Sequence, residues 1–220
     1  MPKKKKILKD LTEDEIEYYF TFLNEEITEY DCGELCKGNN KGIPYCCTAE
    51  HAVPLLYKSE FSFLKKQGDL WHKWVPKTKA DKKIEETAGD DQVFCECKGV
   101  QHCVRNQRSV SCRTFPLEPY LDRRGAFIGL TFLDDFTEKD PDTKKIKCPL
   151  TKKPGDIRQQ FIDSHYTFWE KLLLRSEDER ETYLDSSKDL RKNKKKKGKN
   201  FTVLFPSHLK DLKSVKEYIY

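Results

Sequence analysis

Nine cysteines between Cys32 and Cys148 are the residues of this 220-residue sequence whose type and spacing are best suited to chemistry. Thiolates in one short turn can converge on a metal ion, at about 2.3 Å for zinc, and a second group from a distant segment completes the coordination. An isolated cysteine is explained equally well as a small buried apolar residue, but a cluster favours metal binding. We therefore take all nine as candidate ligands: Cys32, Cys36, Cys46 and Cys47 in a first set, Cys95, Cys97, Cys103 and Cys112 in a second set, and Cys148 alone.

The expected compartment favours thiols over disulfides. Met1-Pro2 is followed by four lysines, but the apolar stretch of a signal peptide does not follow them. No apolar run approaches the length of a membrane span, so we expect no membrane partner. We expect a cytoplasmic protein, in which thiols stay reduced, and an odd number of cysteines cannot pair completely within one chain.

Three arginines near the second set of cysteines have the right charge to support a metal site. Four thiolates around a divalent ion leave a net negative charge that the surroundings must offset. Arg105, Arg108 and Arg113 flank Cys103 and Cys112, and we expect them to donate charge-assisted hydrogen bonds to sulfur. Solvated surface arginines are the alternative for each of them.

Histidines provide two alternative ligands, because imidazole suits both zinc and iron. His102 adjoins Cys103, and His51 follows Cys47 by four residues. A solvated or structurally hydrogen-bonded histidine is the alternative for both. His165 falls on the apolar face of a predicted helix, so we expect a core residue there.

One segment resembles a known family. The residues Arg108-Ser-Val-Ser-Cys112-Arg113-Thr-Phe115-Pro116-Leu117 are similar to the Arg-Pro-x-x-Cys-Arg-x-Phe/Tyr-Pro signature of the CxxCxxCC cysteine-cluster family, also called the YkgJ-like, zinc- or iron-chelating family. The Cys46-Cys47 pair preceded by two cysteines, and the late Cys148-Pro149, are similar too, so the resemblance spans about 32–155. This chain departs from the family in having Ser109 for the usual proline, three residues between Cys32 and Cys36, and a longer 37–45 loop.

The resemblance implies zinc or iron held by cysteines, including an iron–sulfur cluster as one form of the iron. Cys95 and Cys97 compete for one position of the family pattern, which implies that one of them is not a ligand. The same module occurs in flagellin-type lysine N-methylases, which implies an enzymatic role as an alternative function.

Basic charge is concentrated at two places in the chain. Of the net charge of +5, residues 1–10 carry +4 and residues 188–199 carry +7, so that the rest of the chain carries −6. Such lysine-rich segments hold anionic partners, nucleic acid among them, by releasing counterions. The alternative is a pair of solvated, disordered tails.

The N-terminal half of the sequence predicts two helices and a strand. Thr12 to Glu15 form a capping box, and apolar residues at helical spacing carry the predicted helix to Tyr30. A second helical stretch is expected near 48–67, interrupted at Pro54. The mostly charged residues 76–92 predict an exposed loop, and residues 93–97 predict a short strand.

The C-terminal half predicts one buried strand and two further helices. Residues 126–133 are apolar and β-prone, and apolar residues share a face over 156–174. Ser176 to Glu179 form a capping box that begins a shorter helix to about Leu184. Residues 201–219 predict a strand and a short helix, through Leu209, Leu212 and Val215.

Together these features predict an α+β fold, mostly helical, built as a single metal-stabilised domain with short irregular strands and charged tails. Its function is expected to be chelation of zinc or iron in a structural, redox or sensing role. A lysine N-methylase-like enzyme and a nucleic-acid-associated protein acting through its basic tails are the alternatives. The expected parts are a basic tail (1–10), a cysteine-cluster domain (11–175), a helix and lysine-rich linker (176–200) and a C-terminal segment (201–220).

Overall fold

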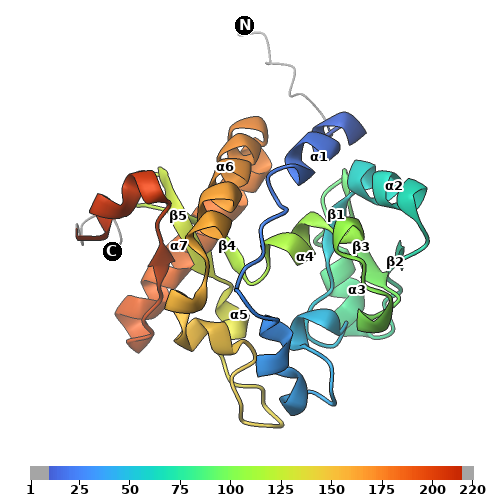
Figure 1. The fold of residues 1–220 in the computed structure, drawn as a ribbon, viewed down its shortest axis with the longest axis horizontal. Helices are drawn as coiled ribbons and strands as arrows, with labels where there is room; N and C mark the ends of the chain where they lie inside the picture. The colour runs from blue at the N-terminus through green and yellow to red at the C-terminus, as the bar shows by residue number, and fades with distance from the viewer. Residues whose placement is uncertain (1–9, 215–220) are drawn as a thin grey trace, which may run out of the picture. The chain divides into compact units, whose positions relative to one another are not determined.

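The computed structural model describes residues 10–214, except the side chains of 197 and 212–214, and divides the chain into two compact units (Figure 1). The first unit comprises Met1–Thr21 and Cys47–Arg113, and the second comprises Phe22–Cys46 and Thr114–Tyr220. Each unit has its own three-stranded sheet, which confirms the α+β class. No helix within residues 10–214 has the length and apolar character needed to cross a bilayer.

The sheet of the first unit has β3 at its centre, paired antiparallel with β1 on one side and β2 on the other. Leu56 lies opposite Val93, and Trp71 lies opposite Cys97. The unit contains α1 (Glu13–Phe20), the end of η3 (Tyr45–Cys47), β1 (Leu55–Tyr57), α2 (Lys58–Gln67), β2 (Trp71–Lys73), α3 (Lys79–Glu85), β3 (Gln92–Cys97), η4 (Val100–His102), η5 (Arg105–Gln107) and α4 (Val110–Thr114).

Aromatic residues contribute much of the core of the first unit. The Phe20 and Phe63 rings meet edge to face, with centroids 5.6 Å apart, where α1 packs on α2. Trp71 is buried, and its indole Nε1 donates to the carbonyl oxygen of Gln107 at 2.7 Å. This bond ties the sheet to the loop that precedes α4.

The first helix begins as predicted but is shorter. Both bonds of the Thr12–Glu15 capping box are present, yet α1 ends at Phe20, so the predicted end at Tyr30 is wrong. The residues that follow belong to the second unit, where the Ile27 carbonyl accepts from the Arg158 amide at 2.9 Å. This main-chain bond ties the segment after α1 to the residue that precedes α6.

Two further predictions for the first unit need correction. Residues 48–57 are not helical, because the chain is extended in β1 and the Pro54 carbonyl accepts from the Cys95 amide at 2.9 Å. The predicted loop 76–92 contains α3, capped by Thr78 and Asp81. Predicted strand 93–97 is confirmed as β3.

The sheet of the second unit has the order β4-β5-β6, again antiparallel. Gly129 on β5 needs its lack of a side chain, since a Cβ there would lie 2.5 Å from the Leu204 carbonyl oxygen of β6. The elements are η1 (Cys32–Leu35), η2 (Lys37–Asn39), most of η3, β4 (Leu117–Leu121), β5 (Phe127–Phe132), α5 (Asp134–Thr137), η6 (Pro149–Lys152), η7 (Pro154–Asp156), α6 (Gln159–Arg175), α7 (Glu177–Lys197), β6 (Val203–Leu204) and η8 (Ser207–Ser214).

Predicted strand 126–133 and predicted helix 156–174 are confirmed as β5 and α6, although α6 starts at Gln159. His165 on α6 is buried, and its Nδ1 lies 2.8 Å from the Phe161 carbonyl oxygen, which confirms it as a core residue.

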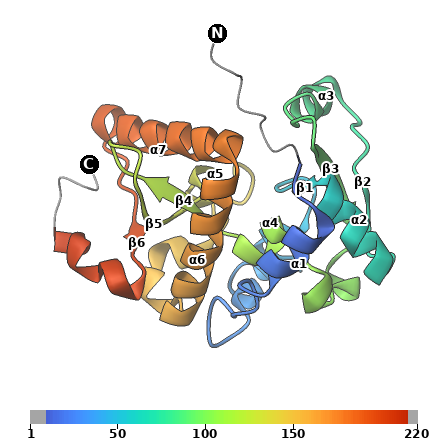
Figure 2. The ribbon, with the colours of Figure 1, turned by 90° about the horizontal axis from the view of Figure 1, so that it is seen from above.

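The last long helix runs much farther than predicted. Ser176 caps α7 by accepting from the Glu179 amide, but the helix continues to Lys197, so the predicted end at Leu184 is wrong. It packs over β4 (Figure 2), where the Leu121 amide donates to Ser187 Oγ at 2.9 Å. Lysine is a good helix former, so the lysine run continues the helix instead of ending it.

The predicted strand and short helix of 201–219 correspond to β6 and to the 3-10 helix η8. Leu209 contacts the hydrophobic cluster of this unit. The side chain of Leu212 and the whole of Val215 lie outside the described residues.

Candidate metal centre

Four cysteines of the first unit lie close enough for their charges to act on one another. Burial, together with the charges of Cys97, Cys47 and Cys103, raises the pKa of the Cys112 thiol to about 12. Burial also raises the pKa of Cys97, on which Cys103 and Cys47 act in the same direction. We call Cys47, Cys97, Cys103 and Cys112 the first thiol group.

Separate short elements bring these four residues together. Cys97 ends β3, after which Gly99 turns the chain with a φ of +98°, a conformation that favours glycine. The turn leads through η4 to Cys103, whose amide donates to the Val100 carbonyl oxygen. Cys112 lies on α4, and Cys47 ends η3.

Ser109 begins the helix that carries Cys112. The Cys112 amide donates to Ser109 Oγ at 3.2 Å, and the Ser109 side chain also lowers the pKa of the Cys112 thiol. Ser109 therefore supplies a capping side chain beside the thiol.

For Arg108, the expected hydrogen bond from a guanidinium to a cysteine sulfur is confirmed. Its Nε donates to Cys103 Sγ at 3.2 Å. Burial alone would lower the pKa of Arg108, but this bond and the charges of Cys103, Cys112 and Cys47 raise it. The guanidinium therefore stays charged among the thiols.

Arg113 orders the loop behind the thiols. Its Nε donates to the Arg108 carbonyl oxygen at 2.9 Å, and its Nη2 donates to that of Asn106 at 2.8 Å. The guanidinium carbon lies 4.3 Å from the centroid of the Phe20 ring. Burial, with the charges of Arg105 and Arg108, lowers the pKa of Arg113 to about 10.

Glu60 is a buried carboxyl bonded to the start of α4, the helix that carries Cys112, and its sequence position alone did not single it out. It is 1% exposed and accepts from the Val110 amide, at the start of α4, at 2.6 Å. Burial raises the pKa of Glu60 to about 7, against the lowering effect of two backbone bonds and of Arg113. A signal was present in the sequence, because Glu60 shares the buried face of α2 with Leu64.

Cys95 and Cys97 differ, although both point to the same face of β3. Cys95 is completely buried, and burial raises the pKa of its thiol to about 12. The charges that act on it are those of Glu60 and Lys73 rather than of other thiols. Cys97, and not Cys95, is therefore the member of this pair that belongs to the first thiol group.

The second unit has its own cluster, which we call the second thiol group: Cys32, Cys36 and Cys148. Burial, together with the charges of Cys32 and Cys36, raises the pKa of Cys148 to about 12. The amides of Leu150 and Thr151 donate to Cys148 and act in the opposite direction.

Local turns position the second thiol group. Cys32 and Cys36 stand at the two ends of η1, which Asp31 caps by accepting from the Gly33 amide at 2.9 Å. Cys36 donates from both its amide and its thiol to the Gly33 carbonyl oxygen, at 3.2 Å and 3.6 Å. Cys46 is half-buried in η3, and its role as a ligand stays a prediction.

No disulfide is assigned to any of the nine cysteines, all of which lie in the described part of the chain. Over residues 10–214, no set of three or more His, Cys, Asp or Glu side chains is arranged to hold a metal ion. The donor type of the first thiol group fits zinc or iron, but its sulfurs would have to draw together around the ion. His102 is exposed on η4, and His51 is half-buried in the turn after η3.

Comparison of the chain with protein-family models, with curated proteins and with solved structures finds no match in any of the three. The resemblance of the Cys112 segment to the cysteine-cluster family therefore stays an expectation from the sequence. The lysine N-methylase alternative and the anionic partner of the lysine-rich segments also stay predictions.

Proposed function

We propose that the first unit binds zinc or iron, the iron as an ion or as an iron–sulfur cluster, through Cys47, Cys97, Cys103 and Cys112. The observation that carries the proposal is the mutual proximity of these four thiols, with the Arg108 guanidinium bonded to Cys103 and close to Cys112 and Cys47. Four soft sulfur donors are a donor set typical of structural zinc and of iron–sulfur clusters.

Charge supports this assignment. Four thiolates and a divalent ion together carry two negative charges, and a buried charge is tolerated only when it is paired and hydrogen-bonded. Arg108 lies within hydrogen-bonding distance of Cys103 and supplies one positive charge. Arg113 and Glu60 hold the loop and the helix start that precede Cys112.

Metal binding would also account for the loop-rich structure around the thiols. The four cysteines come from four short elements. Cys47 ends η3 and Cys97 ends β3, whereas Cys103 follows η4 and Cys112 lies on the five-residue helix α4. A metal ion that joins such segments contributes its binding free energy directly to folding. We therefore assign the ion a structural or sensing role in this unit.

In the same proposal the second thiol group is a separate site within the second unit. Three thiols would hold the ion there, with Cys46 as the candidate fourth ligand, while the amides of Leu150 and Thr151 donate to the Cys148 sulfur. Each site is complete within its own unit, so metal binding at one does not require the other.

Metal and sulfide analysis of the anaerobically purified full chain, with its visible spectrum, tests the proposal. Stoichiometric zinc in a colourless protein assigns zinc, and matching iron, sulfide and visible absorbance assign a cluster. Cys112→Ser and Cys47→Ser should each reduce the metal content. The proposal fails if the chain holds no metal after reconstitution, or if both variants keep the full content.

A further inference from the structure

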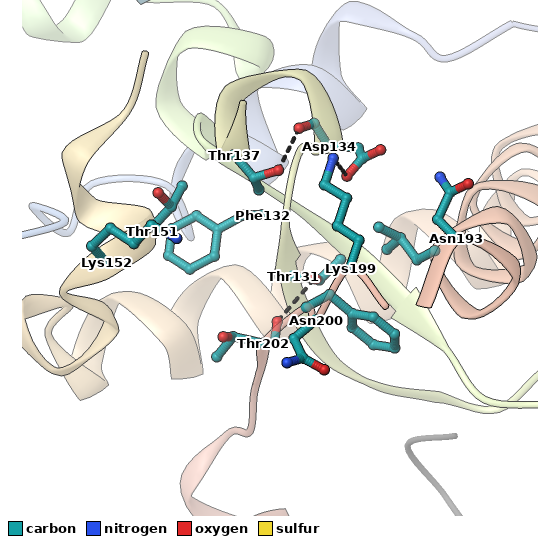
Figure 3. A pocket seen from close by; sticks show the side chains of 12 residues that line it. Thr131, Phe132, Asp134, Thr137, Thr151, Lys152, Asn193, Lys199, Asn200 and Thr202 are labelled. Carbon is teal, nitrogen blue, oxygen red and sulfur yellow. Dashed lines mark hydrogen bonds and ion pairs between the residues drawn. The ribbon is translucent and has the colours of Figure 1, made fainter. Parts of the chain in front are cut away.

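A small pocket in the second unit is lined by no cysteine. Its walls come from β5, α5, η6, α7 and the segment 199–202 that leads into β6 (Figure 3). Its cavity volume is about 50 Å³. Since one water needs roughly 10–15 Å³ of such volume, the pocket has room for a group of a few heavy atoms and not for a whole nucleotide.

One charged side chain of the lining is already paired. Lys199 crosses the pocket in Figure 3, and its Nζ lies 2.7 Å from Asp134 Oδ1. The same Nζ lies 2.9 Å from Glu138 Oε1. This ammonium is therefore shared between two carboxylates of the α5 region.

Three threonine hydroxyls of the lining are engaged as donors. Thr131 donates to the Thr202 carbonyl oxygen at 2.9 Å, Thr137 donates to that of Asp134 at 2.7 Å, and Thr151 donates to that of Cys148 at 2.7 Å. A ligand in the pocket must therefore receive its hydrogen bonds from other side chains.

Lys152, Asn193 and Asn200 are those side chains. All three line the pocket. Within residues 10–214, none of their side chains forms a hydrogen bond or an ion pair. Together they offer one ammonium and two amide groups. The lining has two lysines and one aspartate, so it carries a net positive charge.

We propose that this pocket binds a phosphate group, either as inorganic phosphate or as the head of a small phosphate monoester. A tetrahedral oxyanion accepts several hydrogen bonds at once, and bonds from ammonium groups to it are strengthened by charge. The volume limits the enclosed part of the ligand to about the size of this group. This site is independent of the proposed metal centre.

The Lys199–Asp134 ion pair predicts the direction in which one substitution changes the affinity for phosphate. An anion in the pocket competes with Asp134 for the Lys199 ammonium. Removing the carboxylate charge with Asp134→Asn should therefore strengthen phosphate binding, whereas Lys152→Gln should weaken it about tenfold. Asn193→Ala should weaken binding by a smaller factor, because a neutral donor is lost.

The test is calorimetric titration of the full chain, at constant ionic strength, with inorganic phosphate and with glycerol 3-phosphate. Lys153→Gln and Lys195→Gln are matched controls, since both remove one exposed lysine charge outside the pocket lining. We expect saturable binding that weakens in Lys152→Gln, tightens in Asp134→Asn and is unchanged in both controls.

The two ligands distinguish the source of the group. Comparable affinities assign the pocket to phosphate itself, and binding of glycerol 3-phosphate alone assigns it to a monoester. Lack of saturable binding of either ligand overturns the proposal. Equal weakening in Lys152→Gln and in the two lysine controls also overturns it, because it would show general attraction to a basic surface.

Discussion

In the first unit an arginine side chain donates directly to a cysteine sulfur, whereas in the second unit main-chain amides donate to the Cys148 sulfur. The first arrangement depends on one side chain, Arg108, that a substitution can remove. The second depends on the backbone turn of η6, whose amides remain after any substitution other than proline that preserves the turn. The comparison teaches that the two thiol groups should respond differently to the same kind of mutation.

Removal of metal should have the largest effect. Apparent binding free energies of about 10–16 kcal/mol are typical of structural zinc, so a chelator should destabilise both units by several kcal/mol. Hydrogen exchange should then show lost protection at 32–47 and 95–112. Unchanged exchange in both segments after the metal is removed would contradict the proposal that metal stabilises them.

Glu60→Ala should be the most damaging single change at the start of α4. It leaves the Val110 amide and part of the Arg113 charge without a buried acceptor, which should cost about 3 kcal/mol of unfolding free energy. Urea unfolding measures the loss. Glu17→Ala, at an exposed position of α1, is the control and should change stability by less than about 0.5 kcal/mol.

The second unit has a counterpart of Glu60 in Glu118, which is 8% exposed and accepts from Ser186 Oγ at 2.8 Å. Burial raises the pKa of Glu118 from 4.5 to about 7. The folded state then holds the proton more tightly than the unfolded state. This contribution to stability is complete below pH 4.5 and is lost as the pH rises through about 7.

Glu118→Gln should remove roughly 2–3 kcal/mol of this pH dependence, because an amide does not ionise. Denaturant unfolding between pH 4.5 and pH 8 measures it, on metal-free protein so that metal release does not contribute. A slope as steep as in the wild type would show that Glu118 is not the group responsible.

Arg108→Gln should have the smallest effect and the most selective one. Removing a bonded partner of a metal ligand typically costs 10–100-fold in metal affinity, and only the first thiol group should lose it. Competition with a chromogenic chelator measures the affinity of each site. Arg123→Gln, at an exposed position of the second unit, removes the same charge and should leave both affinities unchanged.

Much of the fold follows from local signals in the sequence. The capping box at Thr12, the β-prone run over 126–133 and the apolar face of 156–174 each specify an element that the structure contains. The division into two units has no such signal, since the chain passes from one unit to the other at 21–22, 46–47 and 113–114. Contacts between residues distant in sequence decide these crossings.

The same limit applies to the candidate site. The sequence identifies the nine cysteines, but spacing places Cys47 with Cys32 and Cys36 and leaves Cys148 alone. In the structure Cys47 joins Cys97, Cys103 and Cys112, and Cys148 joins Cys32 and Cys36. Spacing describes only local turns, and the crossing after Cys46 separates two adjacent residues into different units.

The most direct test of the central claim compares two cysteines on one face of one strand. In Cys97→Ala, the metal content per chain should fall by the amount bound at the first thiol group. In Cys95→Ala, the metal content should match that of the wild type. Far-ultraviolet circular dichroism of both variants confirms that they are folded. Equal metal content in two folded variants, or loss in Cys95→Ala alone, would contradict the assignment of Cys97 to the metal centre.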